Sequence, residues 1–399
     1  MRNVIGIVAE YNPFHNGHAL HLEETRAILG AACPVVCVMS GDFAQRGTPA
    51  VYSKFARAEA AVRCGVDLVL ELPLPWSLAS AEGFARGAVG LLGSLGVVTH
   101  LSFGSECGEI EPLQTVAEAL LDPSLGADIR AEQQGGVPFA AARQRAVARR
   151  VGALAELLDA PNNILAVEYL KAIYDQRLNL RPVTMLRTGA QHDQAGRGRF
   201  RSASELRTFL GAGRDVSGYV PEEAAAVYAR EEKLGRGPVL PENLEIALLS
   251  RLRMLDRAAY AALPDAEEGL GNALHRAAHE EATLDAVLAA AKSKRYALAR
   301  IRRMTMCAAL GVTKGMADGT PPYVRVLAAS GEGRALLREM DEKCALPVIT
   351  KPAAARSLPE EAAALFELSA DAHDLYVLGY GAREERRCGG DWRRSPFLL

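Results

Sequence analysis

The sequence lacks long hydrophobic runs, a basic and apolar leader at its start, and any large excess of charge. None of its apolar stretches approaches the ~18–20 residues that a membrane-spanning helix requires, and the formal net charge of the 399 residues is only −2. The first residues do not show the pattern of a secretory signal peptide. We therefore expect a chain that neither crosses a membrane nor coats nucleic acid non-specifically.

Cysteine spacing gives no sign of metal or disulfide chemistry. Seven cysteines occur, and no two of them form a C-x-x-C pair. Their neighbours are mostly apolar, which favours reduced and packed thiols over a disulfide framework or a zinc site. His275 and His279 are four residues apart but lack the glutamate of an H-E-x-x-H motif, so we interpret them as one helix face. The composition indicates a cytoplasmic globular protein.

The small net charge hides an uneven distribution. From residue 291 onward the chain has 18 Lys and Arg against 13 Asp and Glu, whereas the preceding 290 residues have 28 against 35. A basic C-terminal portion beside an acidic half suits a specific polyanionic partner held by one face. An accident of solvated helix faces explains the asymmetry equally well at this point.

Strands and helices alternate along the first half of the chain. Short apolar runs predict strands, and longer amphipathic runs between them predict helices. Near-continuous apolar strands joined by helices indicate a parallel sheet that is covered on both faces. The predicted strands span 3–9, 34–39, 66–71, 97–103 and 181–186, and the predicted helices span 17–30, 51–64, 79–93, 111–121, 139–150, 163–177 and 203–211.

Beyond about residue 215 the alternation stops. Alanine- and leucine-rich helical patterns dominate from residue 222 to about 310, and they recur at 332–344 and 359–368. We therefore predict an α/β domain over residues 1–215 and a mostly helical domain over residues 216–399.

The most informative motif follows the first strand directly. The segment His15-Asn16-Gly17-His18-Ala19-Leu20-His21 opens a helix after a tight connection that contains Pro13. A strand, a turn and a helix in that order direct backbone N–H groups at an anion above the sheet edge, and the glycine leaves room for a nucleotide. We expect His15 and His18 to bind phosphate oxygens and to stabilise charge as pyrophosphate departs, with His21 in support. Two surface histidines are the alternative interpretation.

A second motif runs from Arg201 to Arg207, after the fifth predicted strand and a glycine-rich loop. Ser202 and Ser204 can cap the following helix while their hydroxyls and the free N–H groups meet triphosphate oxygens, which Arg207 neutralises. An ordinary capping sequence is the alternative, and the local pattern does not decide between the two.

The loop after the second predicted strand carries cations. Residues 40–50 contain a glycine turn, and Lys54 and Arg57 follow on one helix face. Open α/β sheets bind ligands at this edge, so the loop suits a carboxylate or a phosphate. Solvated surface charges are the alternative.

Three more segments end or follow predicted strands. Gly104 closes the fourth strand, Asn162 opens a helix and can hold adenine or ribose, and Arg187 with Thr188 ends the fifth strand. Each is an ordinary loop by itself, but together they would surround one pocket at the ligand edge.

A basic stretch with an interleaved aromatic lies in the second half. Residues 292–296 and 300–303 contain six Lys and Arg around Tyr296, which is typical of contact with a phosphate backbone. A solvated helix paired with acidic neighbours is the alternative. Near the end of the chain, Trp392 among arginines 386, 387, 393 and 394 is either a base-stacking aromatic or part of a frayed terminus.

Several of these segments together resemble one family. They are Glu10-Tyr11-Asn12-Pro13-Phe14-His15-Asn16-Gly17-His18, Met39-Ser40-Gly41-Asp42-Phe43, Gln45-Arg46-Gly47, Ser53-Lys54, Phe103-Gly104-Ser105-Glu106 and Pro161-Asn162-Asn163-Ile164-Leu165. The first string is far more specific than H-x-G-H alone. With the basic stretch near residues 293–303, the chain resembles the bacterial tRNA(Met) cytidine acetate ligases, which are relatives of the nucleotidylyl transferases.

The resemblance implies a Rossmann-like catalytic domain of the nucleotidylyl transferase type and a two-step reaction. Acetate attacks the α-phosphate of ATP and gives acetyl-adenylate and pyrophosphate. The acetyl group then passes to N4 of the wobble cytidine of elongator tRNA(Met). The implied ligands are ATP with Mg²⁺, acetate and the tRNA. Acetate is already ionised near pH 7, so the first step needs alignment and charge neutralisation but no general base.

The resemblance also implies which residues form the site. The catalytic residues would be His15, His18 and Lys54. The nucleotide contacts would be Val8, Ala9, Glu10, Tyr11, Asn12, Pro13, Phe14, His15, Asn16, Gly17, His18, Ala19, Leu20, His21, Gly104, Asn162, Arg187, Thr188, Ser202, Ser204 and Arg207. This sequence departs from the family pattern at Gln191, where an aromatic is more usual, and at Ser204, where threonine is commoner.

Two other functions remain open on the sequence. An adenylyltransferase that makes a dinucleotide cofactor from a small phosphorylated substrate shares H-x-G-H and the serine-rich element, but it does not need the basic second half. A nucleotide-sensing RNA-binding protein would bind ATP without ever cleaving it.

Overall fold

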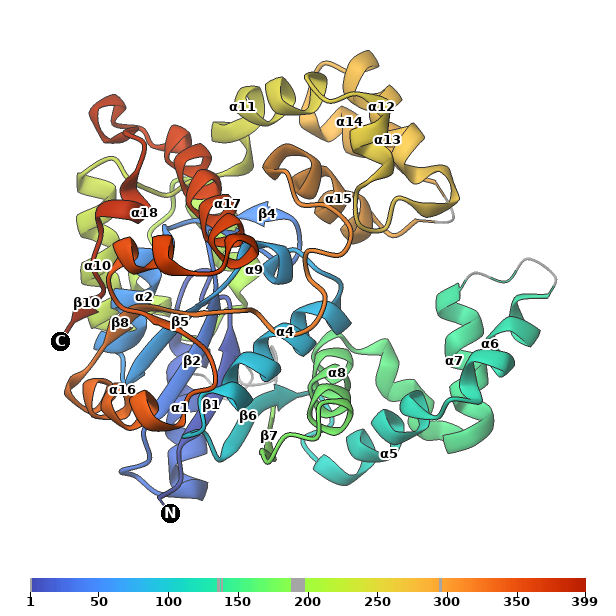
Figure 1. The fold of residues 1–399 in the computed structure, drawn as a ribbon, viewed down its shortest axis with the longest axis horizontal. Helices are drawn as coiled ribbons and strands as arrows, with labels where there is room; N and C mark the ends of the chain where they lie inside the picture. Colours follow the sequence, from blue (N-terminus) through green and yellow to red (C-terminus); the bar gives the residue numbers. More distant parts are fainter. Residues whose placement is uncertain (1, 135–136, 138, 188–197, 294–295) are drawn as a thin grey trace.

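The computed structural model describes residues 2–134, 137, 139–187, 198–293 and 296–399. Within these residues, eight strands form one sheet in the order β10-β8-β5-β2-β1-β6-β7, with β9 paired to β8 (Figure 1). The strands are β1 (Ile5–Ala9), β2 (Val35–Ser40), β5 (Leu68–Leu72), β6 (His100–Ser105), β7 (Arg181–Leu186), β8 (Val324–Ala329), β9 (Val348–Ile349) and β10 (Phe397–Leu398); β3 (Phe43–Ala44) and β4 (Thr48–Pro49) form a separate hairpin.

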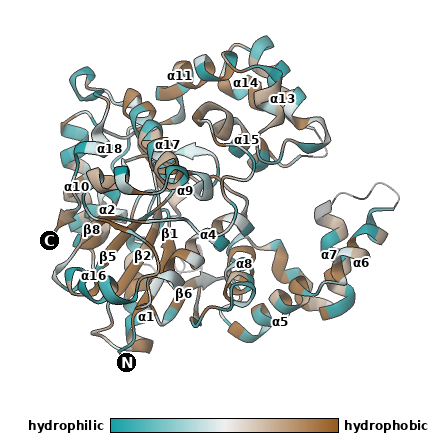
Figure 2. Cartoon of the chain, in the orientation of Figure 1, coloured by the Kyte–Doolittle hydropathy of each residue, from teal (hydrophilic) through white to brown (hydrophobic). Residues whose placement is uncertain are grey.

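The α/β prediction with a parallel sheet is confirmed. All five predicted strands are present within three residues of the expected ends, and β1 pairs in parallel with both β2 and β6. Alternate residues of β2 face two different apolar clusters. Val36 and Val38 belong to a cluster with helices α4 and α8, whereas Val35 and Cys37 pack with helices α1 and α2. Figure 2 shows the apolar residues concentrated in these strands.

The helices around the sheet also lie close to the predicted ranges, except α3 and α6, which the sequence analysis did not predict. These helices are α1 (Asn16–Leu29), α2 (Lys54–Arg63), α3 (Leu74–Ser77), α4 (Ala81–Ser94), α5 (Ile110–Leu121), α6 (Leu125–Gln133), α7 (Phe139–Val151), α8 (Pro161–Asp175) and α9 (Ala203–Gly211). Helices cover both faces of the sheet, so a ligand cannot reach the strands from either face. The carboxyl ends of the parallel strands remain open, and the loops there can hold a ligand.

The second half contains the predicted helices but also strands that the sequence analysis missed. Its helices are α10 (Glu222–Lys233), α11 (Pro241–Arg253), α12 (Arg257–Ala261), α13 (Leu270–Glu280), α14 (Leu284–Ala291), α15 (Leu298–Leu310), α16 (Gly331–Lys343), α17 (Glu360–Tyr376) and α18 (Gly390–Arg393). Helices α11–α15 share their own apolar core and form a lobe beside the sheet (Figure 1).

The part predicted to be mostly helical also contains three strands that the sequence analysis did not predict, β8, β9 and β10. Strand β8 pairs antiparallel with β5, and β10 pairs with β8. The sequence of β8, Val-Arg-Val-Leu-Ala-Ala, contains helix-forming residues and a charge, so it lacks the apolar signature of a buried strand. A domain division at residue 215 stays a prediction, and it would separate β8 from the sheet that contains it.

No helix in the described part of the chain combines the length and the apolar character that crossing a membrane requires. All seven cysteines are free thiols, as the sequence analysis expected.

Candidate nucleotide-binding site

The loop between β1 and α1, residues 10–15, which we call the histidine loop, is held by hydrogen bonds from several other segments. The side-chain oxygen of Asn12 accepts the backbone N–H of Val51 at 2.9 Å, and its backbone oxygen accepts from Arg207 Nη1 at 2.9 Å. The backbone N–H of Phe14 donates to the hydroxyl of Tyr228 at 2.9 Å. These bonds hold the chain entering α1 in one conformation, which is what a preorganised ligand loop requires.

His15 and His18 form a reciprocal cap at the start of α1. His15 Nδ1 accepts the backbone N–H of Gly17 at 3.0 Å, and His18 Nδ1 accepts the backbone N–H of His15 at 3.2 Å. The two rings stack with centroids 3.8 Å apart. Histidines here take the places that Ser or Thr and Glu occupy in an ordinary capping box.

Both capping imidazoles are neutral at pH 7. Burial, followed by the positive charges of Arg187 and Arg207, lowers the pKa of His15 to about 3. Burial also lowers the pKa of His18 well below its ordinary value, and His15 and Arg187 add to the effect. A neutral ring whose Nδ1 accepts a hydrogen bond carries its proton on Nε2. The cap therefore leaves each ring with one N–H donor, at Nε2.

His21 lies one turn further along and is held by a chain of hydroxyls. The hydroxyl of Thr25 donates to the backbone oxygen of His21 at 2.7 Å, which uses its single proton. Ser102 Oγ therefore donates to Thr25 Oγ1 at 2.8 Å and accepts from His21 Nε2 at 2.9 Å. Burial, followed by Arg187, lowers the pKa of His21 to about 4. The sequence analysis missed Thr25 and Ser102, since nothing in the sequence brings them together.

Gly17 is required by the cap. A Cβ at this position would lie 2.9 Å from Cε1 and 3.1 Å from Nδ1 of His15. The sequence analysis attributed this glycine to the approach of a nucleotide. The structure gives a local reason, because the imidazole of His15 occupies the space that a side chain would fill.

Gly104, Asn162 and Arg187 come together as the sequence analysis expected. Arg187 Nη1 donates to Asn162 Oδ1 at 2.9 Å, and Glu106 accepts from the backbone and side-chain N–H groups of Asn162 at 3.1 and 2.6 Å. A Cβ on Gly104 would lie 2.6 Å from Cγ of Arg187, so only glycine lets the arginine cross β6. Because Arg187 lowers the pKa of three histidines, this group faces the same edge as α1. Thr188 lies outside the described residues.

The cations after β2 have structural partners. Arg57 is fully buried, and its guanidinium donates to the backbone oxygens of Glu10, Ser40 and Gly41. It therefore joins the carboxyl ends of β1 and β2. The sequence analysis predicted either a ligand-binding cation or a solvated one at this position, and Arg57 is neither, because its guanidinium is buried against backbone carbonyls. The five donors of a planar guanidinium suit such a cluster of carbonyls.

Lys54 is fully buried in a network of charges. Its ammonium lies 2.7 Å from Glu71 Oε1 and 2.6 Å from Asp391 Oδ2, and Arg325 pairs with the same two carboxylates. Burial alone would lower the pKa of Lys54, but Asp391 and Glu71 raise it above its ordinary value. In this arrangement the lysine neutralises protein carboxylates. The sequence could not predict this, because Asp391 is 337 residues away.

Asp42, which follows the carboxyl end of β2, extends this network. One of its carboxylate oxygens accepts the backbone N–H of Lys54 at 2.7 Å, and the other lies 2.8 Å from Nδ1 of His373. Burial opposes ionisation of Asp42, but His373, Lys54 and Arg57 together more than compensate and lower the pKa of the carboxyl. Helices α17 and α18 near the C-terminus, through His373 and Asp391, thus hold the loop that follows β2.

Ser202 begins α9 as an ordinary capping residue. Its hydroxyl accepts the backbone N–H of Glu205 at 3.2 Å, and Glu205 accepts the backbone N–H of Ser202 at 2.8 Å. Ser202 thus caps α9, which both interpretations of this segment require, and its contact with a triphosphate stays a prediction. Ser204 is exposed on the first turn, and Arg207 is bonded to Asn12 in the histidine loop. Helix α9 thus lies beside that loop.

The basic stretch and the C-terminal tail are partly engaged by the fold. Lys294 and Arg295 lie outside the described residues. Arg300 Nη2 donates to the backbone oxygen of Asp265 at 2.9 Å, whereas Arg302 is exposed. Trp392 packs against Phe366 at 4.8 Å between ring centroids, so the tail is not frayed there.

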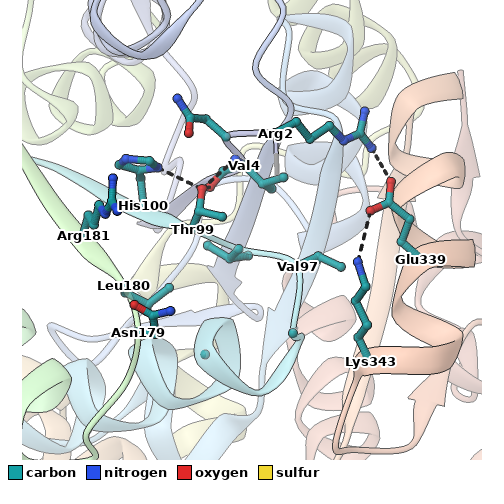
Figure 3. A pocket seen from close by; sticks show the side chains of 14 residues that line it. Arg2, Val4, Val97, Thr99, His100, Asn179, Leu180, Arg181, Glu339 and Lys343 are labelled. Carbon is teal, nitrogen blue, oxygen red and sulfur yellow. Dashed lines mark hydrogen bonds and ion pairs between the residues drawn. The ribbon is translucent and has the colours of Figure 1, made fainter.

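A cavity of about 710 Å³ opens at the opposite edge of the sheet, where β1 and β6 begin (Figure 3). Arg2, His100 and Lys343 line it, but Arg2 and Lys343 share the carboxylate of Glu339 at 2.6 and 3.7 Å. Because the strands are parallel, this cavity is separate from the histidine loop at their carboxyl ends.

A family model described as HIGH Nucleotidyl Transferase matches residues 2–390. A tRNA(Met) cytidine acetate ligase of Caldanaerobacter subterraneus subsp. tengcongensis is 38% identical over 386 residues, which cover 94% of this chain and 95% of the relative. The chain belongs to this ligase family of HIGH nucleotidyl transferases. The tRNA(Met) cytidine acetate ligase of Thermotoga petrophila is 36% identical over 414 residues and covers 98% of this chain and 99% of its own.

Solved structures agree with this family assignment. The crystal structure of Thermotoga maritima TmcAL bound with alpha-thio ATP has a TM-score of 0.93 and 35% sequence identity to this chain. The match covers 100% of this chain and 99% of that one. The apo crystal form of the same protein gives the same TM-score and coverage. The family predicted from the E-Y-N-P-F-H-N-G-H string is thus confirmed.

Proposed function

We propose that this chain is a ligase that uses ATP to activate acetate as acetyl-adenylate and then acetylates N4 of the wobble cytidine of elongator tRNA(Met). The observation that carries the proposal is the pair of neutral imidazoles at the carboxyl end of β1, each with Nε2 as its donor. Two relatives with this activity in their names, and the likeness to a TmcAL structure with alpha-thio ATP, support it.

In the first step, His15 and His18 would donate hydrogen bonds from Nε2 to phosphate oxygens of ATP. An acetate oxygen attacks the α-phosphorus, the bond to the β-phosphate oxygen breaks, and pyrophosphate leaves. Negative charge shifts onto the leaving group, and fixed donors in a site with little water stabilise that charge most effectively. Acetate enters as an anion, so this step moves no proton.

We assign the nucleoside side of ATP to Arg187, Asn162 and Gly104. Arg187 is oriented by Asn162, which is itself held by Glu106. A guanidinium fixed in this way offers its remaining N–H groups to the ribose or to the α-phosphate. We assign the other predicted contacts within the described residues, which are residues 8–21, Ser202, Ser204 and Arg207, to the walls of the same site.

We do not include Lys54 in the proposed catalytic set, although the family resemblance suggested it. Two carboxylates already neutralise its buried ammonium. Its proposed role is to hold the loop after β2 against the histidine loop, where Gln45 N–H donates to Glu10 at 2.9 Å.

The proposed Mg²⁺ would accompany ATP. In the described ranges, no group of three or more His, Cys, Asp or Glu side chains is arranged to hold an ion without the nucleotide. No step is assigned to the ion.

In the second step, the N4 amine of cytidine would attack the acetyl carbonyl, and AMP would leave. The attacking amine loses a proton in this step, and that proton is released to solvent. The base must be exposed to reach the adenylate, which fits an unpaired base in an anticodon loop. The location of this chemistry would be the cytoplasm, where such RNA is found.

Mass spectrometry of tRNA tests the proposal directly. Incubation of the protein with ATP, acetate and unmodified elongator tRNA(Met) should increase the mass of the wobble cytidine by that of one acetyl group less one hydrogen. An unmodified tRNA in the presence of ATP, acetate and Mg²⁺ would contradict the proposal.

Pyrophosphate exchange separates the ligase from the adenylyltransferase alternative. The ligase should incorporate labelled pyrophosphate into ATP only when acetate is present. Exchange that instead requires a mononucleotide would indicate an adenylyltransferase, and bound ATP that is never cleaved would indicate a sensor.

A further inference from the structure

The tip of the β3–β4 hairpin lies against helix α15. The tip residue Gly47 has a positive φ of 71°, and a Cβ there would lie 2.5–2.6 Å from backbone atoms of Arg302 and Arg303. No side chain fits between the hairpin and the helix. The hairpin therefore brings Arg46, the exposed residue before Gly47, next to the basic helix.

Arg46 also lies near the proposed ATP site, because the backbone N–H of the preceding residue, Gln45, donates to Glu10 Oε1 at 2.9 Å. Its positive charge acts on Arg207, whose guanidinium donates to the backbone oxygen of Asn12 in the histidine loop at 2.9 Å. Arg207, Arg46 and Arg302 thus follow one another from the histidine loop to α15, and we call these three residues the arginine track.

Arg300 and Arg303, the neighbours of Arg302 on α15, have partners within the protein. Arg300 Nη2 donates to the backbone oxygen of Asp265 at 2.9 Å, and Arg303 Nη2 lies 3.5 Å from the carboxylate of the same residue, so both arginines are oriented by Asp265. Arg300 also stacks over Tyr296 with 5.3 Å between the guanidinium carbon and the ring centroid. Arg302 is exposed on the same helix. The helix thus offers an exposed cation at the place where the hairpin reaches it.

We propose that Arg46 and Arg302 bind the phosphate backbone of the tRNA substrate and guide its anticodon loop toward the adenylate site. This inference rests on the proposed function. An unpaired base that reaches the histidine loop carries flanking phosphates, and these need cations a short distance from that loop. The arginine track supplies such cations on the path from α15.

The first test is the salt dependence of tRNA binding. For the wild type, the logarithm of the association constant should fall linearly with the logarithm of salt concentration. Arg46→Ala and Arg302→Ala should each weaken binding about tenfold and reduce the slope by about one. Arg46→Lys should keep the slope, because it keeps the charge. Unchanged affinity and slope in both alanine variants would overturn the proposal.

The second test separates this proposal from the proposed function. Arg302→Ala should catalyse acetate-dependent pyrophosphate exchange, which needs no tRNA, within about twofold of the wild-type rate, while its KM for tRNA rises about tenfold. Arg338→Ala, which removes an exposed arginine on α16, is the matched control and should change neither. An unchanged KM for tRNA in Arg302→Ala would overturn the proposed role of the arginine track and leave the proposed function standing. A wild type without acetate-dependent exchange would instead overturn the proposed function.

Discussion

His15 and His18 each use one ring nitrogen for the fold, which leaves the other for a ligand. Nδ1 of each ring accepts a backbone N–H at the start of α1, and burial keeps the rings uncharged. The H-x-G-H spacing therefore follows from helix capping. The glycine accommodates the first ring, and the second histidine occupies the position from which it caps in return. A sequence pattern shows the residues but not this division of labour between ring nitrogens.

Substitution of His18 can separate the two nitrogens. Asparagine places an amide oxygen near the position of Nδ1, whereas glutamine places an amide N–H near the position of Nε2. His18→Asn should keep the cap but lose about 100- to 1,000-fold in acetate-dependent exchange. His18→Gln should retain more exchange while losing about 1 kcal/mol of stability. Wild-type exchange in His18→Asn would contradict the assignment, and urea unfolding gives the stabilities.

The low pKa of His15 makes stability depend on pH. The folded protein holds His15 with a pKa of about 3, whereas the ordinary value is 6.5. Below pH 6.5 the unfolded chain binds a proton that the folded protein cannot, so stability falls with pH until about pH 3. At pH 5 this costs about 2 kcal/mol. His15→Asn retains a capping side chain and should reduce the loss between pH 7 and 5 by that amount in urea titrations. An equal loss in both proteins would contradict the prediction.

At the scale of elements, the sequence predicted the strands and helices whose stabilising contacts lie between residues close in the sequence. Strand β7 and helix α9 have the predicted bounds, and the N-cap of α9 is the Ser202–Glu205 pair visible in the sequence. Strand β8 was missed because Arg325 interrupts its apolar pattern. That arginine is stable in a buried strand only because Glu71 and Asp391 pair with it. Neither partner is near it in the sequence.

Substitution of Gly104 in β6 tests whether the position of Arg187 depends on the absence of a side chain there. Alanine at this position would push the stem of Arg187 away, because its Cβ would lie 2.6 Å from Cγ. The bond from Arg187 to Asn162 would break, and loss of one charged hydrogen bond corresponds to a rise of about tenfold or more in KM for ATP. Gly331→Ala on α16, where the nearest atom lies at 3.8 Å, is the control. Equal KM values for Gly104→Ala and the wild type in exchange assays would contradict this account.

At the scale of the whole molecule, the C-terminal segment completes the sheet that carries the histidine loop. Strands β8 and β10 extend the sheet, and Asp391 and His373 hold the loop after β2 through Lys54 and Asp42. The sequence revealed an acidic first half and a basic C-terminal portion, but not that buried ion pairs join them. Such pairs depend on the complete fold, so composition and motifs cannot show them.

Asp391→Asn tests this connection. The substitution leaves Lys54 and Arg325 with a single buried carboxylate, that of Glu71. An uncompensated buried charge costs about 3–5 kcal/mol of unfolding free energy. Asp371→Asn, at an exposed position on α17, should change stability by no more than about 0.5 kcal/mol. Denaturant unfolding that shows equal stabilities for the two variants would contradict the structural role of Asp391.

The central claim is that His15 and His18 hold the triphosphate through Nε2 while Nδ1 continues to cap α1. A crystal structure with a non-hydrolysable ATP analogue measures this directly. We expect Nε2 of both rings at about 2.7–3.2 Å from phosphate oxygens, with the two backbone bonds intact. A nucleotide bound elsewhere, with both Nε2 atoms out of reach of any phosphate, would contradict the claim.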